Sequence, residues 1–313
     1  MISFCKRTRG AGALLCVWVF AVGLGDAFCA RFALAETPVP DQSEIDAAAA
    51  PALPDAGPQD LCAALTGERH AIVAITDEAT LLLDDGRDVR LAGLLFPAPP
   101  LAVKVAPGAW PPQQAARTAL TNLGALATLQ IAVTGTGRDR HGRPFAQAYA
   151  DRGNEKLWVQ RELVEQGHAL VSSRSGGSAP CLRALLGAEA EARHNKRGLW
   201  ASAPYQVHNA SEPNTLWRLR SNFALVEGKV LNIAARSGRL FLNFGDDWRT
   251  DFTAVVPKNL LTAAPGEAEK LQSLTGHTIR VRGWIERRYG PSIEIFSLSD
   301  LEDLTAPGGV TAP

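Results

Sequence analysis

The sequence lacks an excess of charge of either sign, because its 313 residues include 32 lysines and arginines and 32 aspartates and glutamates. A protein that binds nucleic acid without sequence preference is usually basic, so this balance argues against that role. A sustained internal repeat or heptad pattern is also missing, which argues against solenoids and coiled coils. Hydrophobic residues at 46% and charged residues at 20% are typical of a globular protein, and the length favours two domains.

The sequence has no apolar run of the length that an ordinary membrane span requires. The N-terminal run over residues 11–25 is about fifteen residues long, which suits the apolar region of a signal peptide better than a span. A basic segment ending at Arg9 precedes it, and a small-x-small cleavage site follows at residues 33–35. We therefore expect a signal peptide at residues 1–35 and a periplasmic or secreted protein without a membrane span after cleavage. A retained N-terminal anchor is the alternative.

Cysteine is scarce, and three of the five cysteines lie in the expected signal peptide. Cys62 and Cys181 remain, an even number in an exported chain. An oxidising compartment favours a disulfide between them. By closing a long loop, this disulfide would raise the free energy of unfolding by about 4–5 kcal/mol in the chain-entropy model. Two buried free thiols are the alternative.

Composition divides the rest of the chain into several parts. Residues 36–60 are rich in alanine, proline and aspartate and contain no basic residue, so we expect a disordered linker there. The further boundaries that we expect are a first domain at 61–203, a linker at 204–222, a second domain at 223–304 and a disordered tail at 305–313.

Apolar periodicity predicts the elements of both domains. In the first domain we expect strands at 70–75, 80–83, 89–95, 128–134 and 144–150, and helices at 113–123, 157–166 and 180–196. In the second domain we expect strands at 223–233, 239–244, 251–256, 278–285 and 292–297, and a helix at 268–274. Five short strands with one intervening helix suit a small closed barrel of the OB type.

Two arginines are the clearest candidate binding residues. Arg90 lies in the third expected strand, and Arg143 ends a glycine-bounded basic turn, GRDRHGR, at residues 137–143. Guanidinium groups from neighbouring strands suit a phosphate, because their donors match its oxygens in pairs. Arg140 and His141 of the same turn are further candidate ligand-binding residues. The alternatives are ordinary salt bridges, for example with Asp139 or Asp151, and a solvated His141.

Four segments, in the same order, resemble thermonucleases, the staphylococcal nuclease-like family. They are residues 89–97 (VRLAGLLFP), 139–143 (DRHGR), 163–169 (LVEQGHA) and 190–200 (AEARHNKRGLW). The resemblance implies an α+β, mainly β fold: an OB-type β-barrel with three helices. The second domain more loosely resembles the OB-type domains of some bacterial exported proteins, and would form a second small OB-like barrel.

The resemblance also implies a chemistry, from which this sequence departs. Thermonucleases are calcium-dependent phosphodiesterases that use two metal-binding carboxylates, a glutamate as general base and two arginines on the phosphate. Arg90 and Arg143 match the arginines. The carboxylate positions fall on Ala79 and Leu95, and the base falls on Ala98. The two aromatic base-stacking positions correspond to Ser173 and Ser175.

The sequence therefore predicts an exported thermonuclease-like protein with a degenerate active site, acting as a non-catalytic module. We expect weak phosphate or nucleic-acid binding, a protein partner at the C-terminal barrel, and no metal or cofactor. A second hypothesis is an active secreted nuclease that binds Ca²⁺ through rewired ligands such as Asp77, Glu78 or Asp84. A third is a structural envelope protein in which both barrels serve protein contacts.

Overall fold

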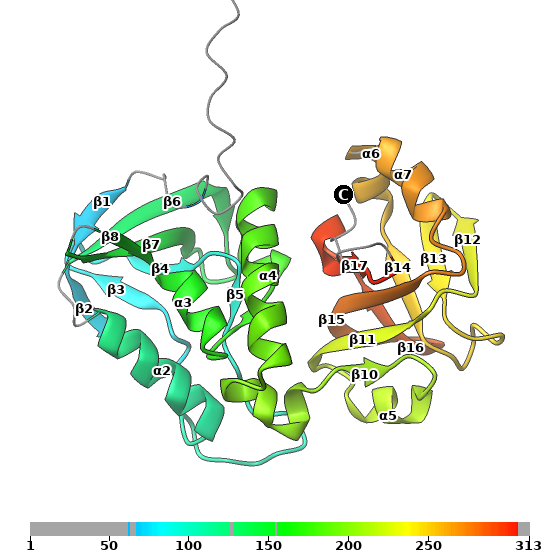
Figure 1. Ribbon diagram of the computed structural model, residues 1–313, viewed down its shortest axis with the longest axis horizontal. Helices are drawn as coiled ribbons and strands as arrows, with labels where there is room; N and C mark the ends of the chain where they lie inside the picture. The colour runs from blue at the N-terminus through cyan, green and yellow to red at the C-terminus, as the bar shows by residue number, and fades with distance from the viewer. Residues whose placement is uncertain (1–61, 63–66, 125–127, 154, 264, 306–313) are drawn as a thin grey trace, which may run out of the picture. The chain divides into compact units, whose positions relative to one another are not determined.

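A computed structural model describes residues 62, 67–124, 128–153, 155–263 and 265–305, which form a mixed α+β fold with two main sheets (Figure 1). All of these residues belong to one compact unit, Leu53–Pro313. The expected signal peptide at 1–35, the linker at 36–60 and all but the first residue of the tail at 305–313 lie outside the described residues. No helix in the described part of the chain is long and apolar enough to cross a membrane.

The first sheet is a nearly closed barrel of seven strands, in the order β1-β6-β7-β4-β3-β2 with β8 paired to β7. The β4–β7 pair is parallel, and the other pairs are antiparallel. The strand bounds are β1 Glu68–His70, β2 Ile72–Ile75, β3 Leu81–Leu83, β4 Asp88–Leu91, β6 Leu129–Arg138, β7 Pro144–Arg152 and β8 Glu155–Trp158.

Alternation along β4 decides which side chains reach the core. Val89 and Leu91 are buried, whereas Asp88 and Arg90 point to the opposite face and are only half-buried. Successive side chains of a strand point to opposite faces, so this pattern fixes Arg90 on the outer face. The expected strand at 89–95 ends earlier than predicted: β5, Leu94–Leu95, leaves the barrel and pairs with β9, Leu170–Val171.

Three helices cover the first barrel, as expected: α2 Pro111–Gly124, α3 Val159–Glu165 and α4 Ala179–His194 (Figure 1). Prolines at 111 and 112 occupy the first turn of α2, where the missing backbone donors cost nothing. The helix predicted from residue 157 begins two residues later. Leu157 and Trp158 belong to β8, because they pair with Ala150 and Tyr149 of β7.

The second sheet contains eight strands, in the order β10-β11-β15-β16-β14-β13-β12 with β17 paired to β15. Its strands are β10 His208–Asn209, β11 Phe223–Lys229, β12 Asn232–Arg236, β13 Arg239–Asn243, β14 Thr253–Val256, β15 Thr278–Arg288, β16 Gly290–Glu294 and β17 Leu301–Asp303. The helix predicted at 268–274 corresponds to α7, Pro265–Gln272, and a further helix that was not predicted, α6 Lys258–Ala263, precedes it.

The segment at 204–222, expected as a linker, is part of this second fold. Its strand β10 pairs with β11, and its helix α5, Pro213–Arg218, places Leu216 in the core of the second sheet with no exposed surface. Few aliphatic residues mark this segment, so its composition did not reveal the contribution of Leu216.

Side chains from both folds share a third apolar cluster. Leu170, Leu199 and Trp200 pack with Leu225 of β11, and Leu95 packs against the same group. The buried Arg282 of β15 adds a hydrogen bond to the backbone carbonyl of Val171, at 3.2 Å. The described residues therefore form one continuous structure in which the two sheets are joined by buried contacts.

Cys62 and Cys181 form a disulfide, with 119 residues of sequence separation and a Cα–Cα distance of 5.5 Å. That spacing lies within the normal range for disulfides. Cys181 is buried in α4, so the bond ties the start of the described chain to the third helix of the first barrel. The pairing agrees with the bridge expected from the cysteine count.

Candidate functional site

Sheet pairing brings the two predicted arginines together. Arg90 lies on β4 opposite Phe145 of β7, and Arg143 directly precedes β7 in the turn that follows β6. Both guanidinium groups approach the same carboxylate oxygen, Oδ2 of Asp139: Arg143 Nε lies 2.7 Å away and Arg90 Nη1 lies 3.6 Å away. The two arginines therefore lie beside the same carboxylate, and the salt bridge with Asp139 that was the alternative to a phosphate site is present.

Asp139 organises the turn as well as the arginines. Its Oδ1 accepts hydrogen bonds from the backbone N–H groups of His141 and Arg143, at 2.8 and 2.9 Å. Gly142 permits the turn, because its φ of 78° lies in the left-handed region. Burial by itself raises the pKa of Asp139, but the hydrogen bonds from Arg143 and His141 outweigh it and lower the pKa to about 2. Asp139 is therefore ionised throughout the physiological range.

Two further carboxylates surround Arg143. Glu78 Oε2 accepts a hydrogen bond from Arg143 Nη2 at 2.7 Å, and Asp88 Oδ2 lies 3.5 Å from Nη1. The hydrogen bond from Arg143 lowers the pKa of Glu78. The cluster of Arg90, Arg143, Glu78, Asp88 and Asp139, called here the arginine–carboxylate cluster, has two positive and three negative charges. An external anion must therefore compete with carboxylates that the protein itself supplies.

Glu78 differs from the other two carboxylates in its exposure. Its side chain is 53% exposed, against 34% for Asp88 and 5% for Asp139. A side chain that is half in water can leave its partner at little cost, whereas the buried Asp139 would remain an unpaired charge. Glu78 is thus the residue that an incoming anion would displace.

The two positions expected for the calcium ligands have apolar surroundings, whereas the position expected for the base is exposed. Ala79 is 3% exposed, belongs to the first core, and has a left-handed φ of 56°. Leu95 pairs with Leu170 and packs on the third apolar cluster. Ala98 is exposed, and its carbonyl oxygen accepts a hydrogen bond from the Tyr205 hydroxyl at 3.3 Å.

The three carboxylates considered as replacement ligands contact different partners. Glu78 contacts Arg143, as described above. Asp77 pairs with Arg117 of α2, and Asp84 bonds to His70 of β1. Of these three residues, Glu78 alone contributes to the arginine–carboxylate cluster among the interactions found in the described chain.

Other predicted site residues have contacts elsewhere. Arg140 Nε donates to Nε2 of His141 at 2.9 Å, and both side chains are exposed. Ser173 and Ser175 are buried, and the Ser173 hydroxyl donates to Asp300 Oδ2 at 2.9 Å. Burial of the Asp300 carboxyl raises its pKa. The two serine positions therefore contact protein rather than solvent.

Sequence reasoning missed the contribution of Asp88 and gave Glu78 only as an alternative metal ligand. Asp88 was detectable in principle, because it stands two residues before Arg90 on the same strand and therefore on the same face. The role of Glu78 depends on how the loop after β2 folds back on the turn at 139–143, and no local pattern in the sequence predicts that contact.

A family described as Staphylococcal nuclease homologue matches residues 109–202. The matched span contains all three helices of the first barrel and Arg143, whereas Arg90 and the three apolar positions precede it. The chain thus contains a staphylococcal nuclease-like domain within an OB-type α+β fold, and this domain points to a nuclease-related family. The sequence matches none of the curated proteins compared with it.

Proposed function

We propose that the chain is an exported, non-catalytic nuclease-like protein that binds a phosphate compound or nucleic acid weakly through Arg90 and Arg143. The single observation that carries this proposal is the arginine pair on Asp139, together with Ala79, Leu95 and Ala98 at the positions where the thermonuclease resemblance implies catalytic acids. Arginines bind phosphate by charge and hydrogen bonds and need no proton transfer, so binding can persist without catalysis.

The surroundings of the three apolar positions support the loss of catalysis. Calcium requires six to eight oxygen ligands, and carboxylates supply most of the charge that replaces its hydration shell. Ala79 in the core and Leu95 on an apolar cluster offer no side-chain oxygen. Ala98 cannot orient or deprotonate a water molecule, and losing a general base typically costs about 10²–10⁴ in rate. We therefore propose no catalytic Ca²⁺ and no cofactor at this candidate site.

The arginine–carboxylate cluster supports weak rather than tight binding. An anion at Arg143 would have to replace the 2.7 Å hydrogen bond to Glu78, while Asp139 stays bound to both arginines. The repulsion between Asp139 and a phosphate further reduces affinity. Export is supported by the disulfide, since such bonds persist in oxidising compartments such as the periplasm or the extracellular space.

A phosphodiesterase assay tests the proposal. Purified protein is incubated with DNA and RNA in Ca²⁺ and, in parallel, in chelator, and phosphate binding is followed by NMR of the arginine Nε–H groups. We expect equal, background cleavage in both buffers, and a phosphate response that is lost in Arg143→Ala. Calcium-dependent cleavage that Arg90→Ala abolishes would contradict the proposal and establish the active nuclease.

One observation favours that active-nuclease alternative: Glu78, a carboxylate, contacts Arg143 directly. Such an enzyme would have to take its Ca²⁺ ligands from Glu78, Asp88 or Asp139. The variant Glu78→Gln distinguishes the two functions, because it removes activity from a rewired nuclease. The non-catalytic protein would show no cleavage before or after the change.

A third candidate, a structural envelope protein with a protein partner at the C-terminal barrel, is favoured by a surface on the second sheet. Trp248 and Tyr289 are 40% and 69% exposed, and their rings meet edge to face at 4.9 Å. Arg249 lies 4.6 Å from the Trp248 ring. Tryptophan, tyrosine and arginine are enriched at interface hot spots. Cross-linking in the native compartment, repeated with Trp248→Ser, tests it: an unchanged cross-link pattern contradicts a partner here.

A further inference from the structure

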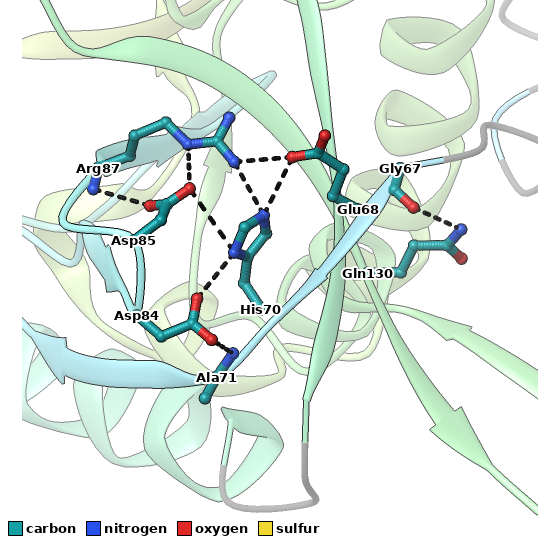
Figure 2. Close-up of polar contacts among 8 residues, drawn as sticks. All are labelled: Gly67, Glu68, His70, Ala71, Asp84, Asp85, Arg87 and Gln130. Atoms are coloured by element: carbon teal, nitrogen blue, oxygen red, sulfur yellow. Dashed lines mark hydrogen bonds and ion pairs between the residues drawn. The ribbon is translucent and has the colours of Figure 1, made fainter.

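The ring of His70 lies between two groups of charged side chains at one edge of the first barrel (Figure 2). Asp84 and Asp85 face the Nδ1 side, with Oδ1 of Asp84 at 2.8 Å and Oδ2 of Asp85 at 3.7 Å. Glu68 and Arg87 face the Nε2 side, at 3.4 and 2.8 Å. The side chain of His70 is 10% exposed, whereas the side chain of Asp84 is 49% exposed.

The backbone holds these groups in place. His70 ends β1, and both aspartates lie in the tight turn between β3 and β4. Gly86, with a φ of 84°, lets the turn close, and Asp84 Oδ2 accepts a hydrogen bond from the backbone N–H of Ala71 at 3.2 Å. The aspartates are therefore directed at the ring by the turn itself, and a ligand bound there would join β1 to the β3–β4 turn.

The hydrogen bonds of the His70 ring leave Asp85 without a hydrogen bond to the ring. The Arg87 guanidinium can only donate, so Nε2 accepts and an uncharged ring carries its proton on Nδ1. That single N–H can serve Asp84 at 2.8 Å, but Asp85 at 3.7 Å is beyond hydrogen-bond distance. A metal cation bound to Nδ1 can contact the carboxylates of both Asp84 and Asp85, whereas the single Nδ1–H group reaches only Asp84.

The charges point to a divalent cation. Glu68, Asp84 and Asp85 contribute three negative charges, Arg87 contributes one positive charge, and the total with an uncharged ring is −2. Carboxylates are ordinarily ionised at neutral pH, so both aspartates can act as anionic ligands. One imidazole nitrogen with two carboxylates suits Zn²⁺ better than Ca²⁺, which prefers oxygen ligands.

We propose that His70, Asp84 and Asp85 form a binding site for Zn²⁺ or a similar divalent transition metal. The ligand atoms of these three residues all lie within 4.8 Å of one another. Water completes the coordination on the exposed side of the two aspartates. This site shares no residue with the arginine–carboxylate cluster, and it does not depend on the proposed function.

Binding requires a proton to move within the ring. The metal takes the Nδ1 lone pair, and the ring proton passes to Nε2, so no proton is released from an uncharged histidine. The Nε2–H group then donates to Glu68, now 3.4 Å away, in the usual carboxylate–histidine–metal arrangement. Arg87 loses its bond to Nε2 but keeps its ion pairs with Glu68 and Asp85. The positive charge of Arg87 lowers the affinity of the site for a cation. Removing that charge, as in Arg87→Met, should therefore raise the affinity.

Calorimetric titration of the chelator-treated full chain with ZnCl₂ and with CaCl₂ tests the proposal. We expect one Zn²⁺ per chain and no binding of Ca²⁺ at the same concentration. His70→Gln and Asp85→Asn should each weaken Zn²⁺ binding at least about tenfold, the size of effect typical of changes around metal sites. Arg87→Met should strengthen it several-fold, because the change removes a like charge.

His277 provides a matched control. Its Nδ1 lies 2.8 Å from Asp303 Oδ2, the same distance as in the His70–Asp84 pair, but only one carboxylate faces its ring among the described residues. His277→Gln should leave Zn²⁺ affinity within about twofold. Asp85 is in an exposed turn, so Asp85→Asn keeps the test valid if His70→Gln fails to fold. Absence of Zn²⁺ binding, wild-type affinity in Asp85→Asn, or unchanged or weaker binding in Arg87→Met would overturn the proposal.

Discussion

Arg282 and Glu189 form an ion pair of 2.8 Å between side chains that are 1% and 0% exposed. Arg282 comes from β15 and Glu189 from α4, so the pair links the two folds of the chain. Glu302 of β17 makes a second ion pair with Arg282, at 2.5 Å. Burial alone lowers the pKa of Arg282, but Glu189 and Glu302 outweigh it and raise the pKa, so the guanidinium stays charged.

We predict that Glu189→Gln lowers the free energy of unfolding by about 3–5 kcal/mol, the range for breaking a buried ion pair. The amide oxygen can still accept the hydrogen bond from the Val171 backbone N–H, so the change mainly removes charge. Denaturant unfolding at pH 7 measures the effect. Glu267→Gln is the control, because its pair with the exposed Lys270 should be worth less than about 1 kcal/mol. Equal effects of the two changes would contradict the prediction.

We predict that Glu78→Gln strengthens phosphate binding at Arg143 by about three- to tenfold, the effect expected from removing one competing charge in water-exposed surroundings. The change replaces the charged partner of the 2.7 Å bond from Arg143 Nη2 by a neutral amide, which competes less strongly with phosphate. Asp77→Asn is the matched control, since it removes the same charge one residue away but breaks an ion pair with Arg117. NMR titration with inorganic phosphate measures both. An equal gain in phosphate affinity in the two variants would indicate a general effect of the lost negative charge and would count against an anion site at Arg143.

We predict that Asp139 makes stability depend on pH in the acid range. Its folded-state pKa of about 2 lies below the ordinary value of 3.8. A depressed pKa contributes stability that is present above the unfolded value and is lost as pH falls through 3.8 toward 2. The contribution at neutral pH is about 2 kcal/mol. Unfolding measured between pH 2 and pH 5 should show this loss in the wild type and a shallower loss in Asp139→Asn. Parallel curves would contradict it.

We predict that the protein isolated from its native compartment contains no free thiol at Cys62 or Cys181. Intact mass spectrometry with an alkylating reagent and without reductant measures this. Reduction should lower stability by about 4–5 kcal/mol, because the disulfide closes a long loop in the unfolded chain. The variant Cys62→Ser/Cys181→Ser should show the same loss without reductant. Two alkylated cysteines in the native protein would contradict the bond.

The sequence alone determined the fold class, the three helices of the first barrel and the pairing of Cys62 with Cys181. The helices depend on local periodicity and the disulfide on a cysteine count, both of which are readable along the chain, whereas the fold class came from the resemblance of four segments to thermonucleases. The resemblance to thermonucleases also suggested that Arg90 and Arg143 act together, and the structure brings them together by pairing β4 with β7. The prediction of a linker at 204–222 was wrong, since one buried residue, Leu216, ties a polar segment to the second core.

The tertiary structure decided which carboxylates surround Arg90 and Arg143 and so compete with an external anion at the candidate site. Glu78 reaches Arg143 from 65 residues away, and Asp300 reaches Ser173 from 127 residues away. His70 likewise meets Asp84 only because β1 lies beside the β3–β4 turn. A contact between side chains far apart in sequence depends on how loops fold back. The energy of one ion pair is also small, so such a contact produces no recognisable pattern in the nearby sequence. The sequence therefore identified which charged residues could form a site, whereas the fold determined which of these residues contact one another.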